Sequence, residues 1–193
     1  DVVSGGEIAR ALAAGMRAED IVFSGVGKTR AELQYALDAG IGQFNLELEE
    51  EGAVLAEMAA ACGKTASAVL RVNPDVDAGT HAKISTGKSE NKFGVPISDA
   101  MGIFSRLSGL PGLNLRGVAC HIGSQLFDLG PLEAAYGRIG ELVTDLRAAV
   151  PGIDDLAVLS AMLDSEAART SPPPRSTVLS LVGDRIAKLT PPA

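Results

Sequence analysis

The chain has 193 residues, of which 17 are basic and 24 acidic, so its formal net charge is −7. This balance argues against nucleic acid and against an anionic membrane surface as partners, and no apolar run approaches the roughly 20 residues of a membrane-spanning helix. Two cysteines and two histidines, far apart in the sequence, argue against a disulfide framework and a metal site. The two cysteines are expected to be free thiols, which fits a reducing, cytoplasmic compartment.

Short apolar runs alternate with helical patterns along the first 150 residues. Ile8, Leu12 and Met16, for example, recur at the spacing of one helix face. In chain order we expect a helix over 4–15, a strand over 21–23, a helix over 29–40, a strand over 43–46, a helix over 50–62, a strand over 66–72, a helix over 98–107, a strand over 115–121 and a helix over 131–150.

Cap residues mark where two of these helices begin. Ser4 precedes Glu7 by three residues, and Thr29 precedes Glu32 by the same distance, which is the spacing of a capping box. Gly40 is the residue type that most often ends a helix. These signals predict helix boundaries independently of the apolar pattern.

Repeated strand–helix units predict a parallel sheet, either doubly wound or closed as a barrel. Segment 25–29 (GVGKT) ends like a phosphate-binding P-loop, but Val22 stands where that motif requires its first glycine. Lys28 and Thr29 are better explained as the start of a capped helix. The barrel is therefore favoured, although the chain is shorter than the about 250 residues of eight units. An incomplete barrel would leave unpaired strand edges.

Polar residues stand where two of the predicted strands end. Arg71 closes one apolar run, and His121 and Ser124 follow another, so we expect all three at one edge of the sheet. Segment 79–94 is too long and polar for a plain connection, which is typical of a lid or substrate loop. The alternatives are a salt bridge from Arg71 to an acid at this edge, a His121 satisfied by the backbone, and a solvated insertion over 79–94.

Five motifs together resemble one family. They are segments 1–7 (DVVSGGE), 23–29 (FSGVGKT), 43–45 (QFN), 71–94 and 121–125 (HIGSQ). In combination they are similar to the barrel domain of diaminopimelate decarboxylases. These belong to the pyridoxal 5′-phosphate (PLP) dependent decarboxylases of ornithine, diaminopimelate and arginine.

The resemblance implies an α/β fold, a partial PLP-binding (β/α)8 barrel with roughly strands two to six. It implies a carboxy-lyase that converts meso-diaminopimelate to lysine in lysine biosynthesis, with an amino-acid substrate and a homodimer in the full-length family. It also implies that His121 is a catalytic residue that packs on the cofactor ring. The other implied positions are Asp1, Arg71 and Ser124 in the cofactor pocket and Thr80, His81, Ser85 and Thr86 in the substrate loop.

The resemblance covers residues 1–150, and the remainder departs from it. By the family pattern the Schiff-base lysine lies upstream of Asp1, so we expect the chain alone to be inactive. A glycine-rich phosphate turn is expected at 156–163, which contains no glycine. We therefore expect a partial barrel domain over 1–150 and a divergent or frameshifted tail over 151–193, poorly ordered in part. A non-catalytic barrel-derived binding module, another decarboxylase of the family and an amino-acid racemase are the alternatives.

Overall fold

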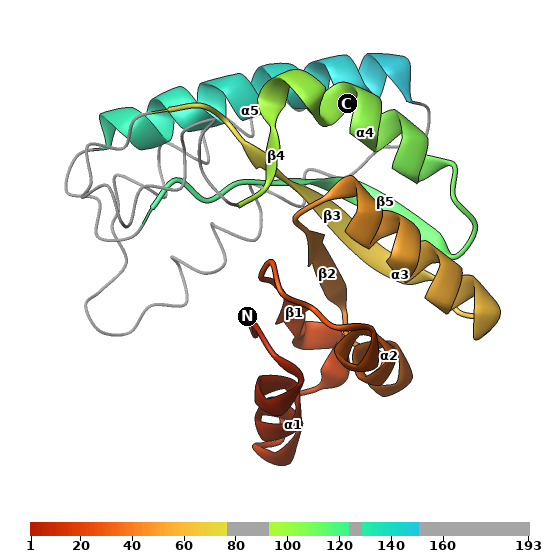
Figure 1. Ribbon diagram of the computed structural model, residues 1–193. Coiled ribbons are helices and arrows are strands. Elements are labelled where there is room, and N and C mark those ends of the chain that lie inside the picture. Colours follow the sequence, from red (N-terminus) through yellow and green to blue (C-terminus); the bar gives the residue numbers. More distant parts are fainter. Residues whose placement is uncertain (77–92, 124–128, 151–193) are drawn as a thin grey trace, which may run out of the picture.

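The computed structural model describes residues 1–76, 93–123 and 129–150 (Figure 1). The predicted tail over 151–193, Ser124 and the substrate-loop residues Thr80, His81, Ser85 and Thr86 lie outside the described residues. The helices are α1 (Gly5–Ala13), the 3-10 turn η1 (Ala18–Asp20), α2 (Arg30–Ala39), α3 (Glu49–Ala61), α4 (Ile97–Ser108) and α5 (Gly130–Ala149). The strands are β1 (Val22–Phe23), β2 (Gln43–Leu46), β3 (Ala66–Asn73), β4 (Val95–Pro96) and β5 (Leu113–Ala119).

All strand pairs in the described part of the sheet are parallel, as predicted. β1 pairs with β2, β2 with β3, and β3 with β5 over residues 66–71. Val2 adds an isolated parallel bridge to Phe23 at the β1 edge. The sheet therefore contains successive strand–helix units in chain order, which confirms the predicted partial α/β barrel fold.

Two differences from the prediction concern the strands around the site. β4 was not predicted: its two residues pair with Val72 and Asn73, just beyond the last residue of β3 that pairs with β5. β5 runs from Leu113 to Ala119 rather than over 115–121, so His121 follows the strand instead of closing it. Both elements depend on neighbouring strands, which a local pattern does not reveal.

The predicted helix caps are present. Ser4 Oγ accepts a hydrogen bond from Glu7 N at 3.2 Å, and Thr29 and Glu32 form a complete capping box. Gly40 ends α2 with φ of 73°. Glu32 does more than was predicted, because its Oε1 also accepts from Gly5 N at 2.9 Å and so joins the starts of α1 and α2.

The expected apolar stripe on the first helix is only partly correct. Ile8 is fully buried, but α1 already ends at Ala13 and Met16 is exposed. The chain leaves the helix through Gly15, whose φ is 88°. A left-handed backbone at this position favours glycine, and it directs Met16 away from the helix face that carries Ile8.

The main core lies between the sheet and the helices that cover one of its faces. Figure 1 shows α3, α4 and α5 grouped on one side of β3 and β5. Alternate residues of β2 point into this core: Phe44 and Leu46 are buried, and the Phe44 ring lies 6.3 Å from that of Phe23. Residues between them in sequence point to the other face, as the period of two in a strand requires.

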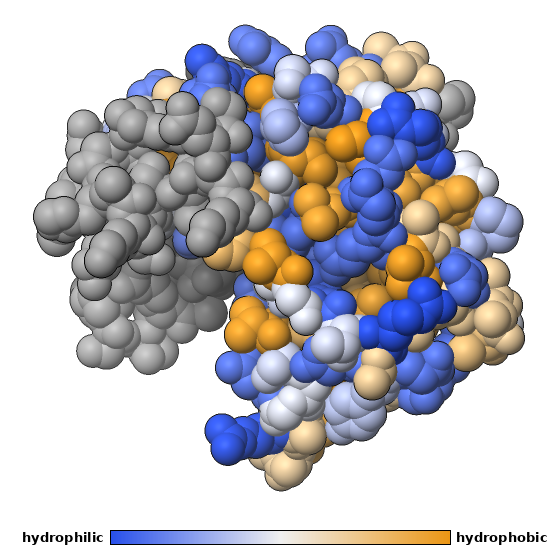
Figure 2. Space-filling model, in the orientation of Figure 1, coloured by the Kyte–Doolittle hydropathy of each residue, from blue (hydrophilic) through white to orange (hydrophobic). Residues whose placement is uncertain are grey.

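That other face of the sheet carries polar side chains. Gln43 Nε2 donates to Asn45 Oδ1 at 2.8 Å, and Asn45 Nδ2 donates to Ser24 Oγ at 2.8 Å. Among the described residues the large exposed apolar side chains are Val3, Met16, Val26, Tyr35 and Leu48. On the face drawn in Figure 2, apolar residues form several groups separated by polar ones. Within the described ranges no helix is long and apolar enough to cross a membrane.

The turn between α2 and β2 is tightly packed at Gly42. Its N–H donates to the carbonyl oxygens of Ala18 and Ile21, at 3.0 and 3.2 Å. A Cβ at this position would lie 1.9 Å from the carbonyl oxygen of Glu19. Glycine is therefore needed here for close backbone approach rather than for an unusual φ.

Candidate active site

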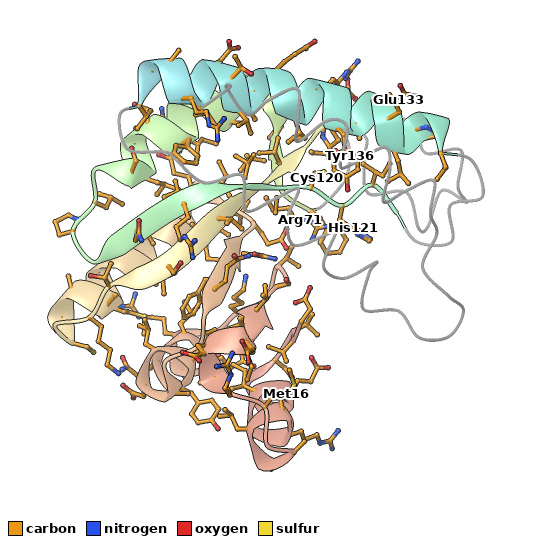
Figure 3. All side chains as sticks on the ribbon, turned by 180° about the vertical axis from the view of Figure 1, so that it is seen from behind. Met16, Arg71, Cys120, His121, Glu133 and Tyr136 are labelled. Atoms are coloured by element: carbon orange, nitrogen blue, oxygen red, sulfur yellow. The ribbon has the colours of Figure 1, made fainter. Side chains whose placement is uncertain are left out.

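Arg71 and His121 lie at the same edge of the sheet, as predicted. Arg71 is near the end of β3 and is in register with Ala119, the last residue of the parallel strand β5; His121 follows two residues later. Figure 3 shows the two side chains next to each other near the carboxyl ends of these strands. The carboxyl edge of the parallel strands therefore carries a permanent cation and an imidazole side by side.

The guanidinium of Arg71 makes two contacts. Its Nη1 donates to Glu47 Oε1 at 2.9 Å, and its Cζ lies 5.2 Å from the centre of the Phe93 ring. The predicted alternative, a salt bridge from Arg71 to an acid at this edge, is therefore present, and the acid is Glu47. The guanidinium therefore combines an ion pair with a cation–π contact.

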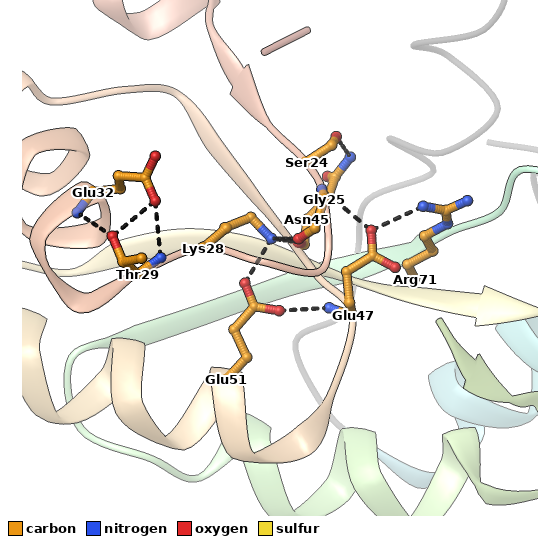
Figure 4. A network of polar contacts seen from close by, with 9 residues as sticks. All are labelled: Ser24, Gly25, Lys28, Thr29, Glu32, Asn45, Glu47, Glu51 and Arg71. Atoms are coloured by element: carbon orange, nitrogen blue, oxygen red, sulfur yellow. Dashed lines mark hydrogen bonds and ion pairs between the residues drawn. The ribbon is translucent and has the colours of Figure 1, made fainter. Parts of the chain in front are cut away.

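Glu47 is the buried acid that connects three strand ends. Glu47 directly follows β2 and is only 1 % exposed. Besides the bond from Arg71, Oε1 accepts from Gly25 N at 3.3 Å, and Glu47 N donates to Glu51 Oε2 at 2.8 Å (Figure 4). Its other oxygen, Oε2, is buried and has no hydrogen-bond partner within the described part of the chain.

Lys28 belongs to the same network, which corrects the prediction that it only begins a capped helix. Its side chain is 1 % exposed, and Nζ donates to Glu51 Oε1 at 2.6 Å and to the carbonyl oxygens of Gly25 and Asn45, each at 2.7 Å. The ammonium also lies 5.5 Å from the centre of the Phe23 ring. All three N–H donors are thus used, and Lys28 supports the loop after β1 (Figure 4).

His121 is exposed at the edge of the site, and its surroundings favour the neutral imidazole. Desolvation by neighbouring groups lowers its pKa, and the positive charge of Arg71 lowers it further, whereas Glu47 acts in the opposite direction. A charge near a titrating group shifts its pKa in this way even without a direct bond. At neutral pH the ring is therefore an uncharged aromatic surface rather than a second cation.

Cys120 and Tyr136 lie behind His121, between the end of β5 and α5 (Figure 3). Burial raises the pKa of the Cys120 thiol to about 12, so at neutral pH the thiol stays protonated and is a poor nucleophile. A small pocket opens here, lined by Cys120, His121, Ile122, Gly123, Leu132, Ala135 and Tyr136. The pocket is mainly apolar and meets the site at His121.

Asp1 is not brought beside these groups. It is exposed and precedes the Val2 bridge to Phe23, so β1 and β2 lie between it and β3. Its predicted place in a cofactor pocket stays a prediction. The structure instead adds Glu47, Phe93 and Lys28, none of which was predicted to belong to the site. Glu47 had a usable signal, since it directly follows the predicted strand over 43–46, but the acidic run that comes after it hides this position.

Replacing Arg71 by glutamine is expected to raise the pKa of His121 toward its ordinary value, because one of the two influences that lower it is removed. Replacing Glu47 by glutamine is expected to lower this pKa, since a negative charge is lost. The measurement is an NMR titration of the imidazole in the chain with His81→Gln, which leaves one histidine. Arg106→Gln, which alters an exposed ion pair with Glu49, is the control. Shifts of equal sign in the Arg71 and Glu47 variants would contradict the arrangement.

Comparison with known proteins identifies the family of the chain. Residues 1–158 match the family model described as the pyridoxal-binding domain of pyridoxal-dependent decarboxylases. The chain belongs to this family. Both Arg71 and His121, and the network that joins Arg71 to Lys28, lie within the matched residues of the decarboxylase domain.

Individual relatives that the chain resembles are diaminopimelate decarboxylases. The chain is 54 % identical over 154 residues to diaminopimelate decarboxylase of Zymomonas mobilis, covering 80 % of this chain and 37 % of that protein. It is 54 % identical over 147 residues to the diaminopimelate decarboxylase of Pseudomonas fluorescens, covering 76 % of this chain and 35 % of the relative. It thus spans little more than a third of these relatives.

Solved structures agree with the fold. The crystal structure of diaminopimelate decarboxylase from Helicobacter pylori complexed with L-lysine is similar with a TM-score of 0.75 and 42 % identity, over 79 % of this chain and 38 % of that one. The M. jannaschii enzyme in co-complex with L-lysine gives a TM-score of 0.78 and 31 % identity, over 97 % and 44 % of the two chains.

Proposed function

We propose that this chain is part of a PLP-dependent carboxy-lyase that converts meso-diaminopimelate to lysine. The observation that carries the proposal is identity of 54 % over 154 residues to a diaminopimelate decarboxylase. The Arg71–Glu47–Lys28 network lies within residues 1–158, which match the pyridoxal-binding domain. The more distant neighbours, such as lysine decarboxylase of Selenomonas ruminantium at 19 % identity, support the fold alone and favour no other substrate.

The residues of the site fit a planar, anionic cofactor such as PLP. A neutral imidazole can lie on an aromatic ring without introducing charge, and aromatic pairs of this kind are worth about 0.5–1.5 kcal/mol. The Arg71 guanidinium offers N–H groups to an anionic oxygen. Glu47 compensates its charge, so the site offers N–H donors to an anion without being strongly basic.

In this proposal each residue has a defined task. His121 packs against the ring and keeps water from that side, Arg71 orients an anionic oxygen, and the protonated Cys120 thiol leaves no competing nucleophile beside them. When bound, PLP supplies the electron sink for the pair of electrons left as carbon dioxide departs. The chain contributes position and electrostatics.

The remaining expectations stay proposals. Asp1 and Ser124 would complete the cofactor pocket, and Thr80, His81, Ser85 and Thr86 the substrate loop. The whole enzyme would be a cytoplasmic homodimer that binds no nucleic acid. The 193-residue chain alone would be inactive: of the lysines in the described ranges, Lys28 has all three donors engaged and Lys64 binds Leu37 and Asp38 on the surface.

A hybrid enzyme tests the proposal. Residues 1–150 of this chain replace the matching segment of the Zymomonas mobilis relative, and release of carbon dioxide is measured with meso-diaminopimelate, ornithine and arginine. We expect turnover with diaminopimelate, none with the chain alone, and about tenfold weaker PLP binding in His121→Ala, from the loss of ring packing. A folded hybrid that does not bind PLP would show the proposal to be wrong.

A further inference from the structure

The ion pair between Arg71 and Glu47 is poorly explained by stability alone. Bringing both charges out of water is costly, and a buried ion pair often contributes no more than apolar residues of the same size. Glu47 adds to this cost because its Oε2 is buried without a partner in the described residues. A buried polar atom of this kind calls for a functional explanation.

Phe93 provides a second contact to Arg71, in addition to the bond with Glu47. The ring lies 5.2 Å from the guanidinium carbon, and the next residue, Gly94, has φ of 76°. A Cβ on Gly94 would lie 2.8 Å from the Arg71 carbonyl oxygen and 3.2 Å from its Cγ. Directly afterwards β4 pairs with Val72 and Asn73. The ring is therefore anchored by the strand on which Arg71 lies.

Glu47 is itself held in place at its backbone and its side chain. Its N–H is bound by Glu51, which Lys28 fixes in turn, and its Oε1 also accepts from Gly25 N. Rotation of its side chain would break the bonds that Oε1 accepts from Arg71 and Gly25. The carboxylate therefore offers Arg71 one fixed acceptor, and this acceptor engages Nη1.

We propose that Glu47 and Phe93 are positioning residues, which fix the Arg71 guanidinium at the carboxyl edge of β3 so that it holds an anionic oxygen of cofactor or substrate. The inference rests on the proposed function, because the anion belongs to PLP or to a substrate carboxylate. Neither residue needs to touch that anion. Displacement of a binding group by about 1 Å can cost roughly 100-fold in rate, so a restraint of this kind is functionally relevant.

The test uses double-mutant cycles in the hybrid enzyme. The variants are Glu47→Ala, Glu47→Gln, Phe93→Leu and Arg71→Gln, with each of the first three also combined with Arg71→Gln. The dissociation constant for PLP, the visible circular dichroism of bound PLP, and kcat and KM for meso-diaminopimelate at saturating PLP are measured. Loss of PLP affinity identifies the cofactor as the source of the anion, and a raised KM alone identifies the substrate carboxylate.

We expect Glu47→Ala and Phe93→Leu each to weaken the affected constant by about tenfold or more, with Glu47→Gln intermediate because it keeps an acceptor. In the Arg71→Gln background these losses are expected to disappear, since positioning residues act only through Arg71. Glu49→Ala, which removes an exposed ion pair with Arg106, is the matched control and is expected to change neither constant. If Glu47→Ala does not fold, the Phe93 cycle decides the question.

Fully additive losses, or constants unchanged in both Glu47→Gln and Phe93→Leu, would overturn the inference while the proposed function stands. An unchanged Arg71→Gln variant would also overturn it. An unsubstituted hybrid that folds but fails to bind PLP would instead overturn the proposed function, so the two failures are distinguishable.

Discussion

Replacing Lys28 by methionine is expected to lower the free energy of unfolding of the hybrid by about 3–5 kcal/mol at pH 7.5, because Glu51 is left as a buried charge without its partner. Methionine keeps the length and the apolar contacts of the lysine stem, but none of the three bonds made by Nζ. Urea unfolding followed by circular dichroism measures the loss. Lys64→Met, in an exposed pair with Asp38, is the control and is expected to cost less than about 1 kcal/mol.

The loss in Lys28→Met is expected to depend on pH. Burial raises the pKa of Glu51 above its ordinary value, and Lys28 partly offsets this effect. A carboxyl with a raised folded-state pKa stabilises the fold below its unfolded pKa, and this stabilisation is lost as the pH rises through the folded value. Without Lys28 the pKa rises further, so the deficit should shrink from pH 7.5 to pH 5. A deficit independent of pH would contradict the assignment of the cost to the Glu51 charge.

Gly42→Ala is expected to destabilise the hybrid by about 3 kcal/mol or more, as in severe overpacking. The added methyl group would lie 1.9 Å from the Glu19 carbonyl oxygen, a backbone atom that cannot rotate away. Relief requires η1 to separate from the turn, which breaks the bonds of Gly42 N–H. Urea unfolding again provides the measurement.

Gly27→Ala is the matched control for Gly42→Ala. A Cβ at Gly27 meets no atom within 4 Å, and its φ is not in the left-handed region. We expect a change within about 0.5 kcal/mol, or a slight stabilisation from reduced freedom of the unfolded chain. Equal losses in the two variants would show that the effect arises from removing any glycine rather than from the contact with Glu19.

Local signals explain what could be predicted of the fold. The caps at Ser4, Thr29 and Gly40 act within four residues, so the sequence contains all the information that they need. The strand–helix alternation likewise follows from apolar spacing. β4 could not be foreseen, because two residues carry no periodicity and this strand exists only through its pairing with Val72 and Asn73.

The site was predictable to the extent that single residues stand at strand ends. Arg71 and His121 were found in this way. Their environment was not, since Glu47 is 24 residues from Arg71 and Glu51 is 23 residues from Lys28 in sequence. Glu47 is followed by other acidic residues, and Lys28 stands just before a helix. Neither pattern indicates a buried side chain until the strands are placed next to one another.

The short strand β4 has a consequence for how this family can vary. β3 pairs with β5 up to Arg71 and with β4 at the next two residues. The chain therefore leaves β3 and returns to it at fixed points, with Phe93 and Gly94 just before the return. Insertions or deletions between residues 76 and 93 can change the length of the intervening segment without moving Arg71. Among homologues, we expect length to vary inside these limits while the Phe-Gly pair keeps its distance from β4.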